Sequence, residues 1–276
     1  MSLRLDSHQH FWRMDRGDYA WLREAPAALQ RDFLPSELQP TLLRQSVAQT
    51  VLVQAAGTVE ETDYLLELAA EHAFIGGVVG WVDLSRRDSI ATLERWSRQP
   101  KFKGVRPMLQ DLPEPNWIAT RALPQALDAL ASLGLRLDAL VMPQHLQSLL
   151  EVLRARPSLP VVINHAAKPQ LARGWHADWV PSWCQHMGEL AALPQVCCKF
   201  SGLTAPLDEV RPVWELLMQW FGPRRLMWGS DWPVLTLAGN YASWVERSAA
   251  LIDALPEDEA VQVWRGTAQR FYGLQG

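Results

Sequence analysis

Short apolar runs recur along the chain and alternate with longer segments in which apolar residues return every three or four positions. The runs are rich in Val, Leu and Ile and lack strict alternation, which is typical of strands buried on both faces. They predict eight strands, at residues 3–8, 50–54, 75–82, 102–106, 135–141, 160–165, 196–200 and 225–231. The segments between them predict helices, among them residues 60–70, 122–133, 143–156 and 207–221.

A strand followed by a helix, repeated eight times, predicts an α/β fold: one (β/α)8 TIM barrel spanning residues 1–276 as a single domain. A doubly wound open sheet is the alternative. No Gly-x-Gly-x-x-Gly motif follows the first strand, however, which counts against a dinucleotide site. The long aromatic loop from His10 to Pro35 leaves the carboxyl end of the first strand, and we expect it to act as a lid. Residues 255–273 predict a final helix packed on the outside of the barrel.

Composition and charge narrow the class of protein. The chain of 276 residues is 48% hydrophobic and 20% charged, as ordinary globular proteins are. A net charge of −4 offers no basic field for nucleic acid, and no apolar run is long enough for a membrane span. The cysteines have neither disulfide nor zinc spacing, and no signal peptide is visible. We therefore expect a cytoplasmic protein with neither a nucleic-acid nor a membrane partner.

Residues suited to catalysis fall at the ends of the predicted strands. His8 and His10 point the same way along a strand, so they offer two imidazoles to a metal ion or to an oxygen with developing negative charge. His165 ends the sixth strand and Asp231 the eighth. Barrel active sites lie at the carboxyl ends of strands, so we expect these four side chains to meet as catalytic residues, or as ligands of one divalent ion. The ordinary alternatives are a core histidine at 165 and a turn aspartate at 231.

Further residues at the same rim are candidates for binding a substrate. Arg106 offers a planar fork to a carboxylate or carbonyl oxygen, with a barrel-end salt bridge as the alternative, and Lys199 has the alternative of an ion pair with a neighbouring acid. Tryptophan rings could line the pocket. The expected substrate-binding residues are Gln54, Arg106, Lys168, Lys199, Trp12, Trp21, Trp81 and Trp232. His145, by contrast, is predicted to be an exposed helix residue.

Motifs that span nearly the whole chain carry a resemblance. They include Asp6-Ser7-His8-Gln9-His10-Phe11-Trp12, Gly104-Val105-Arg106, His165-x-x-Lys168-Pro169 and Met227-Trp228-Gly229-Ser230-Asp231-Trp232-Pro233. Together they resemble the amidohydrolase superfamily, in particular the lactonase-like "amidohydrolase 2" branch with its L-fucono- and L-rhamnono-lactone hydrolases and 2-pyrone-4,6-dicarboxylate lactonase. Binuclear members of the superfamily usually place a lysine on the fourth strand and a histidine on the fifth, where this chain has Arg106 and Met142. The resemblance therefore implies one weakly held divalent ion, such as zinc, or no metal at all.

The resemblance implies hydrolysis of a cyclic ester. Our hypothesis is that Asp231 acts as general base on water while His8, His10 and His165 polarise the carbonyl of a sugar lactone such as an L-fucono- or L-rhamnono-lactone. The alternatives are a 2-pyrone-4,6-dicarboxylate-type lactonase, a metal-dependent decarboxylase of the same superfamily, and a non-catalytic binding protein. The motifs Asp18-Tyr19-x-Trp21-Leu22 and Arg31-Asp32-Phe33-Leu34-Pro35 favour the sugar lactone. The oligomeric state stays open, with a homo-oligomer among the alternatives.

Overall fold

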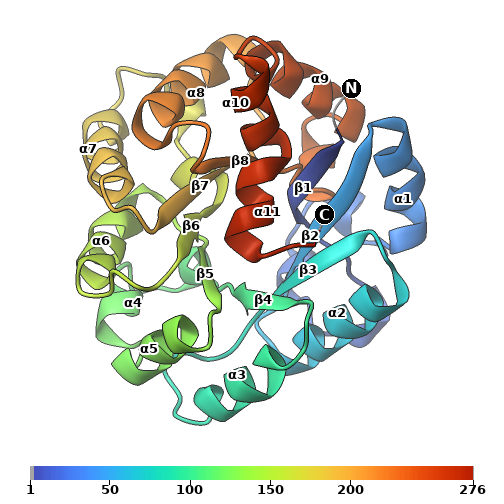
Figure 1. Ribbon diagram of the computed structural model, residues 1–276, viewed down its shortest axis with the longest axis vertical. Helices are drawn as coiled ribbons and strands as arrows, with labels where there is room; N and C mark the ends of the chain where they lie inside the picture. Colours follow the sequence, from blue (N-terminus) through green and yellow to red (C-terminus); the bar gives the residue numbers. More distant parts are fainter. Residues whose placement is uncertain (1–2, 276) are drawn as a thin grey trace.

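Eight parallel strands lie side by side in chain order and form one sheet (Figure 1). The computed structural model describes residues 3–275. The sheet closes where Gln9 pairs with Trp232, just beyond the last strand. The strands are β1 (Arg4–Gln9), β2 (Val47–Val53), β3 (Ile75–Gly80), β4 (Phe102–Val105), β5 (Arg136–Ala139), β6 (Val161–Ile163), β7 (Val196–Phe200) and β8 (Leu226–Trp228). The predicted (β/α)8 TIM barrel is therefore confirmed.

Helices follow the strands and cover the outside of the barrel (Figure 1). The apolar stripe predicted for residues 60–70 packs inward, since Leu65 and Ala69 are fully buried. Thr58 starts this helix by accepting a hydrogen bond from the backbone N–H of Glu61. The helices are α1 (Pro35–Arg44), α2 (Val59–Glu71), α3 (Ser89–Ser97), the short α4 (Trp117–Thr120), α5 (Pro124–Ser132), α6 (Leu146–Arg154), α7 (Trp179–Ala191), α8 (Leu207–Phe221) and α9 (Tyr241–Ile252). Within residues 3–275, none of them has the length and hydropathy needed to cross a membrane.

The segment after β1 is folded onto the carboxyl end of the barrel. It contains three short 3₁₀ helices, η1 (Met14–Arg16), η2 (Ala20–Arg23) and η3 (Ala27–Leu29). Trp12 pairs with Phe33 through backbone hydrogen bonds, and the two rings pack edge to face at 5.1 Å. The Trp21 indole donates to the carbonyl of Ala55, beyond β2, at 2.8 Å. Because its aromatic side chains are anchored in this way, the segment forms a wall of the barrel mouth; opening as a lid stays a prediction.

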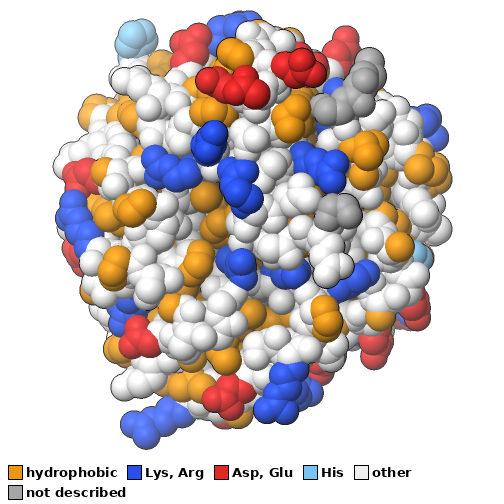
Figure 2. Space-filling view, viewed as in Figure 1, with side chains coloured by type: hydrophobic (Ala, Val, Ile, Leu, Met, Phe, Trp, Pro, Cys, Tyr) orange, Lys and Arg blue, Asp and Glu red, His pale blue; other side chains and the backbone are white. Residues whose placement is uncertain are grey.

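The carboxyl-terminal segment lies outside the strands, as predicted, and crosses the amino-terminal mouth of the barrel (Figure 1). It comprises α10 (Glu257–Val261), a π-helical turn (Gln262–Gly266) and α11 (Thr267–Tyr272). Tyr272 enters the barrel and packs in a core cluster with Leu5 and Val51. Lysine and arginine side chains lie across this face (Figure 2). Lys103 and Arg136 donate to the carbonyls of Gly273 and Phe271, which stabilises the carboxyl end of α11.

The prediction that His145 is an exposed helix residue is wrong. His145 is 3% exposed and ends a 3₁₀ turn, η5 (Pro143–His145), just before α6. Its Nδ1 accepts a hydrogen bond from the backbone N–H of Met142 at 3.0 Å. The imidazole therefore turns back to cap its own turn, a local contact that hydrophobic periodicity does not reveal.

Candidate active site

A cavity of about 170 Å³ opens at the carboxyl ends of the strands. It is lined by His10, Trp12, Trp21, Ala55, Arg106, Met108, Gln110, Asp111, Leu140, His165, Lys168, Asp231 and Val234. A wider groove of about 780 Å³ adjoins it and shares Lys168, Asp231 and Val234. The predicted catalytic rim thus has a real cavity, with an open groove as its route to solvent.

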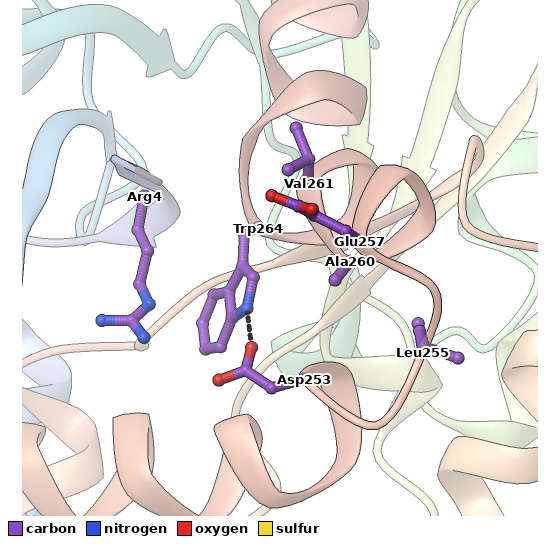
Figure 3. A pocket seen from close by; sticks show the side chains of 7 residues that line it. All are labelled: Arg4, Asp253, Leu255, Glu257, Ala260, Val261 and Trp264. Carbon is purple, nitrogen blue, oxygen red and sulfur yellow. Dashed lines mark hydrogen bonds between the residues drawn. The ribbon is translucent and has the colours of Figure 1, made fainter. Parts of the chain in front are cut away.

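A second groove, of about 260 Å³, lies at the opposite end of the barrel near the start of β1 (Figure 3). Three of its side chains contact one another: the Trp264 indole donates to Asp253 at 2.7 Å, and the Arg4 guanidinium lies 4.5 Å from the centre of that ring. None of the predicted catalytic residues lines this groove. We therefore place the candidate active site at the carboxyl end.

Asp231 lies among three imidazoles. Its Oδ1 is 3.7 Å from Nε2 of His8, 3.4 Å from Nε2 of His10 and 3.6 Å from Nε2 of His165. The Nε2 atoms of His8 and His10 are 3.2 Å apart. The structure thus brings together four side chains from the first, sixth and eighth strand ends, with one carboxylate oxygen nearly equidistant from three ring nitrogens.

Two of these residues lie on strained backbone. The strands β6 and β8 end earlier than the sequence predicts, and His165 opens a left-handed turn that runs to Lys168 with φ values of 53°, 51°, 58° and 49°. Asp231 also has a positive φ, of 59°. A left-handed conformation costs about 1–2 kcal/mol for each residue with a Cβ, and such strain clusters at functional sites. Here the Trp183 indole holds the turn by donating to the carbonyl of Ala166 at 2.9 Å.

Glycine at position 202 makes room for one of the imidazoles. A Cβ on Gly202 would lie 2.5 Å from Nδ1 of His165, and its φ is +63°. The Nδ1 of His165 instead faces the Ser201 hydroxyl at 2.9 Å. The Gly-after-Ser order beyond β7 is therefore part of what orients His165.

Burial and neighbouring charges give the carboxylate and the imidazoles of the site different charges at neutral pH. Burial lowers the pKa of His165 to about 3, although Asp231 opposes the shift. Burial also lowers the pKa of His10. Burial raises the pKa of Asp231, but the neighbouring His165, His10 and Lys168 outweigh it and bring that pKa down to about 2. At neutral pH the site therefore holds an ionised carboxylate between neutral imidazoles.

Arg106 and Lys168 are the two predicted cations that line the cavity. Arg106 is 4% exposed and donates through Nη2 to the backbone carbonyl of Gln54, while its Nη1 lies 3.4 Å from Nε2 of His8. Lys168 donates to the side-chain carbonyl of Gln110. Gln54 itself is fully buried and donates to the carbonyl of Arg106 at 2.7 Å. Gln54 thus holds Arg106 in place and does not line the cavity.

Lys199 lies inside the barrel beneath the cavity. Its Nζ is 2.6 Å from Asp138 Oδ2 and 3.2 Å from Nδ1 of His8, and all three side chains are fully buried. The ion pair that the sequence analysis gave as the alternative role of Lys199 is therefore present. A contact with substrate stays a prediction, because Lys199 is absent from the cavity lining.

The four predicted tryptophans separate into two pairs. Trp12 and Trp21 line the cavity. Trp232 packs between Phe11 and Phe33, with ring centres 5.7 Å and 5.3 Å away. Trp81 faces a different groove, beside Gly57, because the Thr62 hydroxyl binds its backbone N–H at 2.9 Å after β3 has ended. Neither Trp232 nor Trp81 reaches the cavity.

Sequence reasoning missed several residues of the site. Met108, Gln110 and Asp111 follow β4 and line the cavity, but nothing in their local pattern marks them. Asp138 had a usable signal: it lies between Leu137 and Ala139 in a predicted strand, and a carboxylate buried in a strand must be paired. Its partners, Lys199 and Tyr272, come from distant parts of the chain.

His8, His10 and Asp231 have the spacing of metal ligands, but the hydrogen bonds of the two histidines suit a metal ion only in part. Ligands of a tetrahedral zinc ion lie about 3.3 Å apart when zinc–nitrogen distances are about 2.0–2.1 Å, and His8, His10 and Asp231 present atoms at comparable spacing. A ligating histidine normally donates its other ring N–H to an acceptor. His10 does so, with Nδ1 2.7 Å from the carbonyl of Val53. His8 does not, because its Nδ1 faces the Lys199 ammonium.

Known proteins resemble this chain along nearly its whole length. A family model described as Amidohydrolase matches residues 5–274. An L-fucono-1,5-lactonase of Burkholderia ambifaria is 44% identical over 99% of this chain and 97% of its own length, and one of Burkholderia multivorans is 37% identical over the same shares. A crystal structure of an amidohydrolase from Burkholderia multivorans with bound zinc superposes with a TM-score of 0.91 at 34% identity, covering 99% of this chain and 100% of that one. This chain therefore belongs to the amidohydrolase family.

Proposed function

We propose that this protein hydrolyses a sugar lactone, with L-fucono-1,5-lactone or a similar 1,5-aldonolactone as its substrate. The observation that carries the proposal is the position of the Asp231 carboxylate, within 3.7 Å of three imidazole nitrogens beside a small cavity. The two relatives named L-fucono-1,5-lactonase support the same class of reaction.

In the proposed reaction Asp231 takes a proton from a water molecule as the water oxygen attacks the lactone carbonyl. The carbonyl π electrons move to oxygen and form a tetrahedral oxyanion. When this collapses, the bond between the carbonyl carbon and the ring oxygen breaks, and Asp231 returns its proton to that leaving oxygen. A pKa of about 2 makes Asp231 a weak base in the free protein. A developing oxyanion nearby raises this pKa as the proton is transferred.

Donors beside Asp231 would stabilise the oxyanion. The Arg106 guanidinium lines the cavity and is such a donor, whereas His8, whose Nε2 lies 3.4 Å from Nη1 of Arg106, is fully buried and does not line the cavity. Each preorganised donor of this kind is worth about 3–4 kcal/mol in a site that excludes water. A divalent ion, when bound, would be held by His8, His10 and Asp231, with His165 as a fourth ligand, and would polarise the same carbonyl oxygen.

The cavity suits one uncharged ring. Its volume of about 170 Å³ equals about six water molecules at about 30 Å³ each, which leaves no room for an oligosaccharide. Trp12 and Trp21 offer apolar faces to the ring, while Lys168, Gln110 and Asp111 offer partners for its hydroxyl groups. The ring-opened acid would leave through the adjoining groove of about 780 Å³.

A pyrone dicarboxylate fits this cavity less well. Such a substrate carries two negative charges, but Arg106 and Lys168 share the cavity with Asp111 and Asp231. The third cation considered in the sequence, Lys199, is neutralised by Asp138 at 2.6 Å. The balance of charge therefore favours a neutral lactone. A metal-dependent decarboxylase would need a firmly bound ion, which the contact between His8 and Lys199 opposes.

Proton release on adding lactones tests the proposal. The panel contains 1,5- and 1,4-aldonolactones and pyrone dicarboxylate, each with and without a chelator. We expect fastest release with a 1,5-lactone of the fucose configuration and little effect of the chelator. Turnover of the pyrone alone, or carbon dioxide release from an aromatic acid that stops on chelation, would refute it.

A further inference from the structure

Glu61, on α2, is a carboxylate buried behind the wall of the cavity. Its side chain has 0% exposure, and its hydrogen-bond partners are backbone N–H groups of the loop after β2. Ala55 donates to Oε1 at 3.0 Å, and Ala56 donates to Oε2 at 2.8 Å. A buried ion is costly to hold and is weak evidence for a role in stability. The two peptide groups that this carboxylate binds indicate another role.

Each of these peptide groups makes a second contact on its opposite side. In a planar trans peptide the N–H and the preceding carbonyl point in opposite directions, and neither of these two bonds is cis. The N–H of Ala56 shares its peptide group with the carbonyl of Ala55, which accepts from the Trp21 indole at 2.8 Å. The N–H of Ala55 shares its peptide group with the carbonyl of Gln54, which accepts from Nη2 of Arg106. One carboxylate thus orients two successive carbonyls towards two different side chains.

Both of those side chains line the cavity. The Trp21 ring packs edge to face on Trp12 at 5.5 Å, and its N–H is already bonded to Ala55. A substrate therefore meets the ring of Trp21 and not its N–H. The carbonyl of Gln54 is the shortest contact of the Arg106 guanidinium. The directions of the two carbonyls therefore determine where both side chains lie.

We propose that Glu61 is a positioning residue that places Arg106 and Trp21 in the cavity through two successive peptide groups. The inference rests on the proposed function for the reaction that it affects, but the contacts themselves are independent of that function. The two side chains serve different steps. Arg106 stabilises charge that develops in the transition state, so a change in its position lowers kcat. Trp21 binds the ring of the substrate, so a change in its position raises KM.

The first test follows the indole N–H of Trp21 by proton–nitrogen NMR, without substrate. It is run at pH 8, above the pKa of about 7 to which burial raises Glu61, so the wild-type carboxyl is ionised. The indole signal is identified by its loss in Trp21→Phe. In Glu61→Gln one amide oxygen must serve two peptide groups, so we expect the bond to Ala55 to lengthen and the indole proton to move upfield.

An indole signal that Glu61→Gln leaves unchanged would overturn the inference. If the signal moves but the wild-type protein opens no lactone, the proposed function fails and the link from Glu61 to Trp21 stands. Should Glu61→Gln fail to fold, Glu61→Asp takes its place, because it keeps the charge but withdraws it by one methylene group from both N–H groups.

The second test is a double-mutant cycle at pH 8 with a 1,5-aldonolactone. Glu61→Gln should lower kcat about tenfold and raise KM about fivefold, the equivalent of one hydrogen bond. Trp21→Phe keeps a ring but cannot donate to Ala55, so it should raise KM with kcat unchanged. In the double variant kcat should fall as in Glu61→Gln, while KM rises no further, because both changes break the same contact. Increases in KM that multiply, or a wild-type kcat in Glu61→Gln, would contradict the positioning role.

Thr62→Val is the matched control. Thr62 is the next residue of α2 and is also fully buried, and its hydroxyl accepts from the backbone N–H of Trp81 at 2.9 Å. It thus makes the comparable contact with the loop after β3, which carries Trp81 to a different groove. We expect Thr62→Val to lower the melting temperature as Glu61→Gln does, with wild-type kcat and KM. Equal kinetic losses in the two variants would mean that Glu61 acts only through the stability of α2.

Discussion

Replacing Ala167 by glycine should leave stability almost unchanged, although the same replacement in a helix is costly. Ala167 is fully buried and has a φ of +58° within the left-handed turn from His165 to Lys168. Glycine relieves about 1–2 kcal/mol of left-handed strain. Against this, glycine lowers stability by about 0.8 kcal/mol because the buried methyl group is deleted. It lowers stability further, by about 0.4–1 kcal/mol, because glycine gives the unfolded chain more conformational freedom. The opposing contributions leave a net change within about 1 kcal/mol of zero.

Ala69 provides the comparison, because it is equally buried but lies in regular α2. Ala69→Gly loses the methyl group and about 0.8–1 kcal/mol of helix propensity, with no strain to relieve, so we expect a loss of about 1.5–2 kcal/mol. Urea unfolding of both variants at 25 °C, fitted with a common slope, measures the difference. Equal losses would mean that the left-handed turn stores no strain, and the account of how His165 and Lys168 are positioned would be refuted.

Three further predictions concern the site and its surroundings. Asp231→Asn keeps the shape of the side chain but removes the base, so kcat should fall at least about 1,000-fold with KM little changed; near-normal turnover would reject the assignment. Arg106→Lys loses the planar fork that contacts both Gln54 and the His8 side of the site, so kcat should fall about 10–100-fold, whereas an unchanged kcat would show that charge alone suffices. Burial raises the pKa of Glu61 to about 7, against the backbone N–H groups of Ala55 and Ala56 that lower it. A carboxyl whose pKa is higher in the folded state binds its proton more tightly there. The free energy of unfolding should therefore rise as pH falls from 8 towards 5, by about 1.4 kcal/mol for each pKa unit of difference between the folded and unfolded states. Glu61→Gln should flatten this slope in urea titrations, and an unchanged slope would mean that another group causes the pH dependence.

The sequence was most informative where the physical cause is local. Runs such as Val196–Phe200 and Leu207–Phe221 predict their strand and helix with the observed bounds. The spacing of apolar residues that predicts each element depends only on residues close together in the sequence. The spacing of His8 and His10 likewise follows from strand geometry. From strand order, the rim position of His165 and Asp231 could also be predicted, since all parallel strands of a barrel end at one face.

Only the tertiary structure decided which of the rim residues face the cavity and which are paired elsewhere. Trp81 and Trp232 follow their strands as Trp12 and Trp21 follow β1, yet contacts with Thr62, Phe11 and Phe33 turn them away. The sequence leaves Lys199 as either a substrate contact or half of an ion pair, and only the folded barrel shows that its partner is Asp138, 61 positions away. Tyr272 comes from the last helix of the chain and still reaches that carboxylate. A local pattern cannot encode such partners, because they lie on separate strands and helices and become neighbours only when the chain folds into the barrel.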